Sequence, residues 1–227
     1  MSYANGPKIV TDGLVLCLDA ANRKSYPGSG SIVYDLSANS NNGTLQYNAT
    51  YSSSNGGVIS FDGTGDNLRV AESNSIKTAS SGQFTKSAWF IRNGSPVENY
   101  SNVIWHKRTT IGIDSGGLLT ASAYSIYSYI GATMLDSEVY AEDNIWYHVS
   151  VTYNNTSTKI YVNGELKKTG TATLESESGV TFDIGSGSGI NNYWKGKIGQ
   201  ILSYNRALSS DEIRRNYNAL KGRYGLT

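Results

Sequence analysis

The sequence predicts an all-β protein, an antiparallel sandwich of two sheets with one short helix near the C-terminus. Residues 145–153 alternate between two sides with aromatic and β-branched side chains, as a β-strand does. Asn163-Gly164 follows the next apolar run, 159–162, and is a strong hairpin signal. The 25 glycines among 227 residues suit the many turns that short strands require.

Further strands are predicted on both sides of this central meander. Segment 84–92 has apolar side chains on both of its faces, which predicts a central strand buried on both sides. The other predicted strands are 14–20, 58–61, 67–70, 103–108, 109–114, 118–122, 124–130, 135–140, 180–184 and 194–204. Loops rich in Asn, Ser and Gly separate them, as turn chemistry requires.

One helix is predicted after residue 208. Ser209 and Glu212 have the spacing of a capping box. Ile213, Tyr217 and Leu220 share one face of the helix that follows, and we expect Gly222 to be its C-terminal cap. This helix is expected to lie across an edge or an end of the sandwich.

Size and charge indicate one domain and exclude some partners. Residues 1–12 form a polar N-terminal arm, and 13–227 fit a single all-β domain, without a repeat or linker. The net charge of +1 offers no excess of cations for nucleic acid. No run is long enough to cross a bilayer, and no secretion signal begins the chain. Cys17, in an apolar strand, is expected to be a buried and inert thiol.

The central meander also resembles a known family. The run W-Y-H-V-x-V-T-Y (146–153) followed by I-Y-V-N-G-E (160–165) is similar to the signature hairpins of laminin-G-like domains. Those domains belong to the concanavalin A-like lectin/glucanase superfamily. Other matches, in the expected order, are 13–20, 34–37 with 42–45, 59–63, 84–91 and 196–213. The resemblance implies a concanavalin A-like jelly roll over residues 13–227. One departure is Gly199-Gln200, where the family commonly has an acidic pair.

No catalytic residue is expected. The glucanase relatives carry an E-x-D-x-E strand, whose period of two places the acids on one face. The nearest stretches here, 136–138 and 175–177, lack the third acid. His148 is expected to be a hydrogen-bonded structural histidine, and His106 has no nearby Cys or second His for a zinc site.

Calcium is the one cofactor that the resemblance implies, because many laminin-G-like relatives hold it at a loop edge. Asp62, Asp66 and Asn67 could supply hard oxygen ligands. The competing interpretation is an Asp-Gly turn with Asx hydrogen bonds, which needs no metal.

Two aromatic stretches are candidates for contact with a glycan or a protein partner. In the strand 124–130 two tyrosines share one face, and a later loop places amides beside rings. The candidate residues are Tyr127, Tyr129, Asn191, Asn192, Tyr193 and Trp194. The alternative is that these rings pack in the core or in a subunit contact.

Two non-enzymatic functions follow. Residues 8–31 resemble the N-termini of laminin-G-like proteins in tailed-phage virions. This implies a virion protein of a capsid decoration, fibre or appendage, made in the host cytoplasm, that contacts other virion proteins, copies of itself or the host surface. The alternative is a lectin-like carbohydrate-binding module, acting alone or as a receptor-binding tip for a host-surface glycan.

Overall fold

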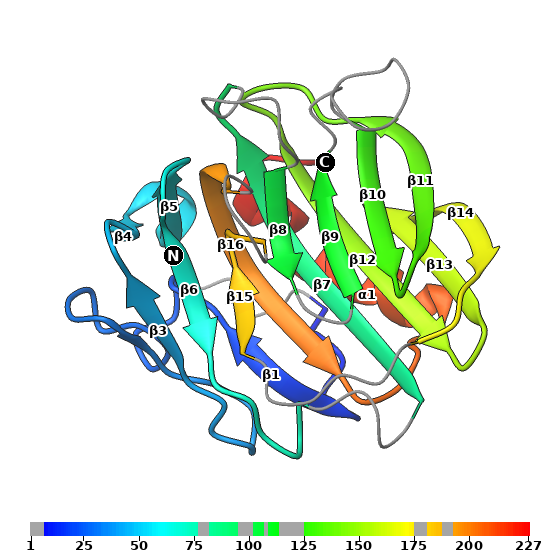
Figure 1. The fold of residues 1–227 in the computed structure, drawn as a ribbon. Helices are drawn as coiled ribbons and strands as arrows, with labels where there is room; N and C mark the ends of the chain where they lie inside the picture. Colours follow the sequence, from blue (N-terminus) through cyan, green and yellow to red (C-terminus); the bar gives the residue numbers. More distant parts are fainter. Residues whose placement is uncertain are drawn as a thin grey trace.

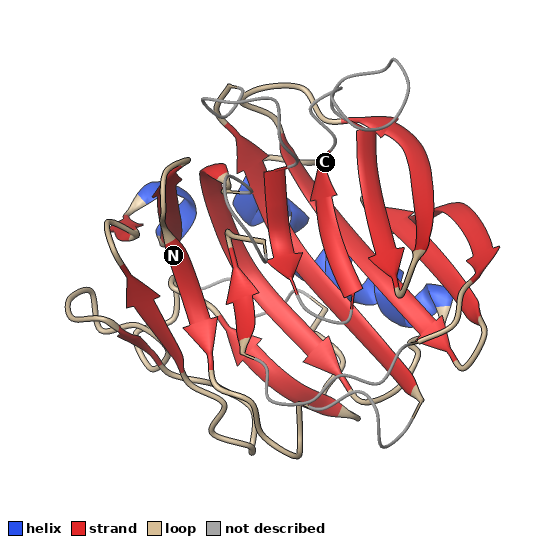
Figure 2. Ribbon diagram, in the orientation of Figure 1, coloured by secondary structure: helices blue, strands red, loops and turns tan. Residues whose placement is uncertain are grey.

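Two antiparallel sheets of eight strands each pack face to face in the computed structural model of the chain (Figures 1 and 2). The structure describes residues 7–76, 82–94, 102–106, 109–113, 125–174, 181–187 and 193–227. The predicted all-β sandwich with one C-terminal α-helix is confirmed. The predicted strand 118–122 lies outside the described residues.

Sheet A has the strand order β14-β13-β12-β7-β16-β5-β4, and β1 pairs with β16 as well. Its strands are β1 (Leu14–Leu18), β4 (Thr50–Ser52), β5 (Val58–Asp62), β7 (Gln83–Arg92), β12 (Trp146–Asn154), β13 (Ser157–Val162), β14 (Glu165–Thr171) and β16 (Lys195–Tyr204). The meander predicted from the sequence is β12-β13-β14. Its second turn has positive φ at both Asn163 (51°) and Gly164 (79°), as a type I′ turn requires.

Sheet B has the strand order β11-β10-β9-β8-β15-β6-β3-β2. Its strands are β2 (Ile32–Val33), β3 (Gly43–Gln46), β6 (Asn67–Val70), β8 (Asn102–His106), β9 (Thr109–Ile113), β10 (Ser125–Ile130), β11 (Thr133–Tyr140) and β15 (Phe182–Ile184). Strands distant in sequence are neighbours in this sheet, because β15 lies between β8 and β6. The pairing of β15 with β6 and β8 brings the residues of the candidate site together.

The central strand β7 is buried on both of its faces, as predicted. Phe84, Ala88 and Phe90 face the core between the sheets, where they join side chains of sheet B such as Ile104 and Trp105. Trp89, of opposite parity, faces outward and belongs to a separate cluster. Sheet A therefore needs a cover on its outer side.

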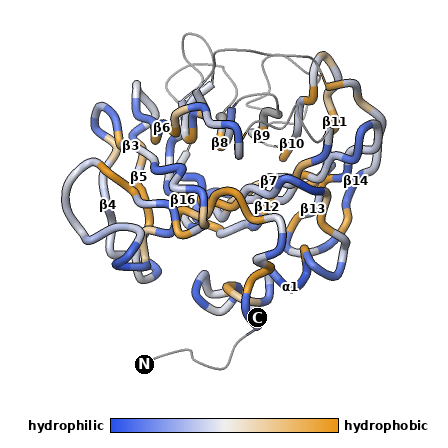
Figure 3. The backbone as a smooth tube through the Cα atoms, turned by 90° about the horizontal axis from the view of Figure 1, so that it is seen from below, coloured by the Kyte–Doolittle hydropathy of each residue, from blue (hydrophilic) through white to orange (hydrophobic). Residues whose placement is uncertain are grey.

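The helix α1 (Ser210–Leu220) and the 3-10 turn η3 (Lys221–Tyr224) provide this cover (Figure 3). The predicted capping box is present: Glu212 N donates to Ser209 Oγ (3.3 Å), and Ser209 N donates to a Glu212 carboxylate oxygen (2.9 Å). The predicted position at an edge or end of the sandwich is wrong. The helix crosses the outer face of sheet A, because the rings on that face are apolar and must be buried.

The predicted C-terminal cap at Gly222 is also wrong, because α1 ends at Leu220 and its C-cap is Lys221. The chain continues through η3, and the left-handed residue is Gly225 (φ 76°). This extra turn brings the Tyr224 ring against Trp89, with ring centroids 4.3 Å apart. Stacking of large rings outweighs the local preference for a glycine cap.

Gly199-Gln200, the departure from the family pattern, is explained by the same tyrosine. A Cβ at Gly199 would lie 2.1 Å from the Tyr224 hydroxyl oxygen. Gln200 N donates to that oxygen at 3.0 Å. The absence of a side chain at residue 199 is therefore required for Tyr224 to reach the sheet.

The described part of the N-terminal arm, residues 7–12, is held by α1 and the sheet beneath it. Val10 N donates to Asn216 Oδ1 (2.8 Å), and the Tyr204 hydroxyl donates to Val10 O (2.9 Å). Arg215 donates to Lys8 O (2.7 Å). The arm and the C-terminal helix thus lie on the same side of the sandwich.

Cys17 is buried in β1, as expected. Burial, followed by the charges of Asp19 and Asp35, raises the pKa of its thiol to about 12. The reactive thiolate is therefore scarce at neutral pH. In the described part of the chain, no helix is both long and apolar enough to cross a membrane.

His148 lies under α1 on the outer face of sheet A and is fully buried. Its Nε2 is 2.8 Å from Ser87 Oγ, which accepts a hydrogen bond from the Ser150 hydroxyl (2.9 Å). The ring also contacts Trp89, with centroids 4.9 Å apart, and its Nδ1 has no hydrogen-bond partner. Burial lowers the pKa of His148 to about 3, so the ring is neutral in the folded protein.

We predict that acid destabilises the fold through His148. Its pKa is lowered from 6.5 in the unfolded chain to about 3 in the folded one. Between these values the unfolded state binds one proton more, so stability falls as the pH falls. From pH 7.5 to 5.0 the free energy of unfolding should decrease by about 2 kcal/mol in urea titrations followed by tryptophan fluorescence.

The variant His148→Gln should lose most of this pH dependence, because glutamine does not titrate. His106→Gln removes the other histidine, which is only half-buried, and serves as the matched control. If wild type and His148→Gln show the same slope over this range, the role given to His148 is wrong.

Candidate functional site

The outer face of sheet B carries no helix or strand among the residues that the structure describes. In Figure 3 the helices lie beneath sheet A, and no described helix or strand lies over the outer side of sheet B. Its inward side chains, such as Leu68, Phe182 and Ile184, belong to the core. Residues that alternate with them point outward, where they are available to a partner.

A row of polar side chains crosses this face. Thr44 on β3 pairs with Arg69 on β6, and Arg69 pairs with Asp183 on β15. Asp183 pairs in turn with His106 on β8. Four outward positions from four strands are thereby placed side by side, although they are far apart in the sequence.

The row continues to an aromatic residue. Trp105 pairs with Ile111, so the antiparallel register places His106 beside Thr110. Thr110 pairs with Tyr129 on β10. From Thr44 to Tyr129 the row spans five strand spacings, or roughly 24 Å. We call this row the sheet-B face.

A forked ion pair occupies the middle of the sheet-B face. Arg69 Nε and Nη2 lie 2.7 and 3.4 Å from the two oxygens of Asp183. The hydrogen bond that Arg69 donates to Asp183 is the largest cause of the raised pKa of Arg69, to which the charges of Asp183 and Tyr47 add. The Arg69 side chain is 40% exposed. Two of its five N–H donors bind Asp183, so three remain for a ligand.

Tyr47 places an exposed ring in the turn that follows β3, the strand beside β6. It is 78% exposed, and it sits in the turn after β3 with a positive φ of 58°. Such a backbone is uncommon for a residue other than glycine. The preceding strand, β3, pairs with β6, where Thr44 lies opposite Arg69. An apolar ring and charged donors and acceptors are therefore offered together.

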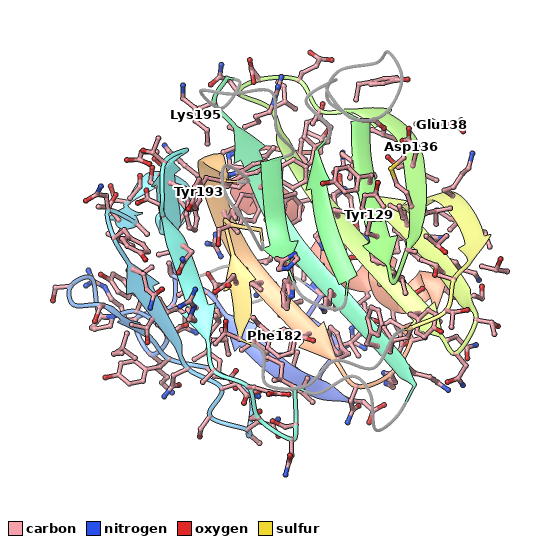
Figure 4. All side chains as sticks on the ribbon, in the orientation of Figure 1. Tyr129, Asp136, Glu138, Phe182, Tyr193 and Lys195 are labelled. Carbon is pink, nitrogen blue, oxygen red and sulfur yellow. The ribbon has the colours of Figure 1, made fainter. Side chains whose placement is uncertain are left out.

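Tyr127 and Tyr129, two candidates from the sequence, lie at the other end of the face. Their rings are in contact at 5.5 Å, in edge-to-face geometry. Tyr127 is buried, whereas Tyr129 is only half-buried, so Tyr129 alone of the two reaches the surface. Figure 4 shows Tyr129 on β10 and Asp136 on the neighbouring β11. Asp136 Oδ1 accepts hydrogen bonds from the Ser125 hydroxyl and from Glu138 N.

The other two aromatic candidates, Trp194 and Tyr193, differ in their burial. Trp194 is fully buried, and its ring packs edge-on against Phe90 at 5.4 Å. Of the two interpretations left open for Trp194, its burial supports packing in the core. Tyr193 is half-buried and lies toward β16, away from Tyr129 (Figure 4). Asn191 and Asn192 lie outside the described residues.

The calcium candidates form a turn held by hydrogen bonds. The two oxygens of Asp66 accept from Asn48 N (2.8 Å) and Asp62 N (2.9 Å). Asp62 Oδ1 accepts from the backbone N–H of Thr64 (2.7 Å) and from its hydroxyl (2.8 Å). Burial raises the pKa of Asp66, and the Asp62 charge adds to it.

This arrangement does not fit a calcium site. Three of the four carboxylate oxygens already accept hydrogen bonds, and Asp66 is fully buried. Asn67 Oδ1 has no partner but is itself buried. No group of three or more metal-ligating side chains occurs among the described residues. The turn is therefore the better interpretation of these three residues.

We predict that calcium removal leaves stability unchanged. Hydrogen bonds rather than a cation occupy the oxygens of Asp62 and Asp66, so EGTA should shift the melting temperature by less than about 1 °C. Differential scanning calorimetry with EGTA, and with added CaCl₂, measures this. A rise of several degrees with CaCl₂ would require a calcium site after all.

On the sheet-B face, Asp136 and Asp183 are too far apart to form a catalytic pair. A glycosidase needs its two acids within roughly 10 Å of each other. Asp136 and Asp183 are separated by four strand spacings, or roughly 19 Å. Glu138 has a positive φ of 60°, which breaks the alternation in β11, and its side chain pairs with Lys168 of β14. The stretch 175–177 lies outside the described residues.

Tyr47, Arg69 and Asp183 were missed by reasoning from the sequence alone. A signal was available for two of them, because each is a single charged residue between apolar neighbours in a short strand. Charges at such positions must point away from the core. The opposite charges of Arg69 and Asp183 predict an ion pair only when β6 and β15 are known to be neighbouring strands.

A laminin-G-type family model, described as the concanavalin A-like lectin/glucanases superfamily, matches residues 62–214. This is more than half of the chain, and the chain belongs to that superfamily. The resemblance stated from the sequence is confirmed at this level, while the phage context stays a prediction. No curated protein sequence matches the chain significantly.

Solved structures of several proteins share the fold. Domain 4 of AbnA, a GH43 extracellular arabinanase from Geobacillus stearothermophilus, in complex with arabinotriose, has a TM-score of 0.67 at 16% identity, over 90% of this chain and 98% of that one. The binding domain of Paraclostridial Mosquitocidal Protein 1 has a TM-score of 0.70 at 15% identity, and the match covers 95% of this chain and 56% of that one. Trypanosoma rangeli sialidase has a TM-score of 0.69 at 20% identity, and the match covers 96% of this chain and 34% of that one. The chain thus spans about a third of the sialidase and about half of the mosquitocidal chain. Identities this low establish a common fold and no common activity.

Proposed function

We propose that the chain is a non-catalytic carbohydrate-binding module whose ligand lies along the sheet-B face. The observation that carries this proposal is the Arg69–Asp183 fork on the outer side of sheet B, with the exposed Tyr47 ring in the turn after the neighbouring strand β3. Tyr129 marks the other end of the same row. The ligand is an oligosaccharide that runs across the strands.

The chemistry of the row suits a sugar. Sugar hydroxyls both donate and accept hydrogen bonds, while the ring carbons present apolar C–H faces. Tyr47 and Tyr129 offer apolar ring surface with a polar hydroxyl tip. Arg69 offers donors, and Asp183 and Asp136 offer acceptors, in charge-assisted hydrogen bonds that fix orientation. The ion pair is internally balanced, which favours a neutral ligand.

The length of the row supports an extended ligand. The roughly 24 Å from Thr44 to Tyr129 exceeds a single sugar ring. A domain of the same fold has been seen with a bound trisaccharide, since domain 4 of the arabinanase was solved in complex with arabinotriose. At 16% identity that structure supports the class of ligand and not the choice of sugar.

The absence of catalysis is part of the proposal. Asp136 and Asp183 are too far apart to act as an acid and a nucleophile on one glycosidic bond. The virion role expected from residues 8–31 stays a prediction. A sheet-B face that binds host-surface glycans would serve a receptor-binding tip equally well.

We predict that Tyr47→Ala and Arg69→Gln weaken glycan binding at least tenfold. The first variant removes the exposed ring, and the second removes the donor fork while it keeps an amide. A glycan array with the whole chain identifies the ligand, and isothermal titration calorimetry of the best hit measures the loss. Thermal melts verify that each variant is folded.

Leu166→Ala is the matched control, because Leu166 is 47% exposed on β14 of the other sheet. It removes exposed apolar area without touching the sheet-B face and should bind as wild type does. An array without any hit, or a hit that both variants bind unchanged, is the result that excludes this site. Release of sugar from the hit by the wild-type protein would contradict the non-catalytic role.

A further inference from the structure

A groove lies on the outer side of sheet A, between the β12-β13 hairpin and the start of α1. Its volume is ≈ 540 Å³, within the range of ligand pockets, which is roughly 300–1,000 Å³. The lining residues are Thr152, Asn154, Ser157, Lys159, Tyr161, Arg206, Ala207, Leu208, Ser209, Ser210 and Glu212. We call it the hairpin groove.

The floor of the hairpin groove carries polar side chains without partners. Thr152 pairs with Lys159, and Asn154 with Ser157, so these four share the outer face of sheet A. The side chains of Asn154, Ser157 and Lys159 form no hydrogen bond or ion pair within the described part of the chain. An amide, a hydroxyl and an ammonium group are therefore free to bind a ligand.

The charged groups in the wall of the hairpin groove are paired with one another. Arg206 Nη1 and Nη2 bind the two oxygens of Glu212 at 2.8 and 2.6 Å, and Arg206 Nε lies 2.9 Å from Asp12 Oδ2. The Arg206 hydrogen bonds lower the pKa of Glu212 to about 2, so this carboxylate stays ionised. The start of α1 is closed by its capping box and supplies no further anion site.

Lys159 is thus the one lining charge of the hairpin groove that lacks an ion-pair partner among the described residues. A cation lacking a counter-charge in a partly enclosed polar groove favours an anionic ligand. The one aromatic ring in the lining, Tyr161, is only 1% exposed. The groove therefore offers no flat apolar wall to a planar aromatic ligand, and hydroxyl groups dominate its surface.

We propose that the hairpin groove binds an acidic sugar, with its carboxylate on Lys159 and its hydroxyls on Asn154, Ser157 and Thr152. This site is separate from the sheet-B face and does not rest on glycan binding there. A uronic acid has the required chemistry, since it joins one negative charge to several hydroxyls on a small ring.

Titration of the ¹⁵N-labelled whole chain with sodium glucuronate tests the proposal, with glucose as the neutral counterpart. Glucuronate should shift the amide signals of residues 152–159 and bind at least fivefold more tightly than glucose. The variant Lys159→Gln should weaken the binding of glucuronate at least fivefold and remove the preference for glucuronate over glucose. A higher salt concentration should weaken the binding of glucuronate more than that of glucose, because salt screens the interaction between Lys159 and the carboxylate.

Lys167→Gln is the matched control, since Lys167 pairs with Glu165 on β14 rather than lining the groove. It should bind glucuronate as wild type does, and so should Arg69→Gln. No shift at residues 152–159, equal binding by Lys159→Gln, or loss in Arg69→Gln would overturn the proposal. Because Arg69→Gln and Lys159→Gln affect different sites, failure of one proposal is distinguishable from failure of the other.

Discussion

The structure depends on the need to bury both faces of sheet A. The inner face of β7 meets sheet B, while its outer face carries Trp89 and, through β12, His148. Rings on that side are stable only under a cover, which α1 and η3 provide through Tyr217 and Tyr224. The C-terminal segment therefore covers sheet A, and in the described part of the chain no helix covers the outer face of sheet B.

Local signals predicted the elements of the fold well, because each depends on a few adjacent residues. The period of two in β12, the Asn163-Gly164 turn and the capping box at Ser209 all appear as expected. The position of α1 and the 3-10 turn η3 that follows it were not predictable in this way. They are decided by the fit of Tyr224 beside Gly199, two residues whose contact exists only in the folded chain.

The candidate site was less predictable, for the same physical reason. Alternation placed Tyr127 and Tyr129 on one side of β10, but it could not show that Tyr127 is buried. Arg69 and Asp183 are 114 residues apart, so their ion pair follows from strand order and not from any local pattern. The acids at 62 and 66 illustrate the converse, because side chains adjacent in a loop turned toward backbone donors and not toward a metal.

The arm at residues 7–12 and the C-terminal turn both lie behind sheet A (Figure 3). A tether or fusion partner attached at either end would therefore emerge from the back of the molecule. The sheet-B face would then be presented outward without steric hindrance from its carrier. Because the ends of the chain and the sheet-B face lie on opposite sides, many copies could be fixed to one support by their ends. Weak binding at each proposed sheet-B site would then add up to strong multivalent binding.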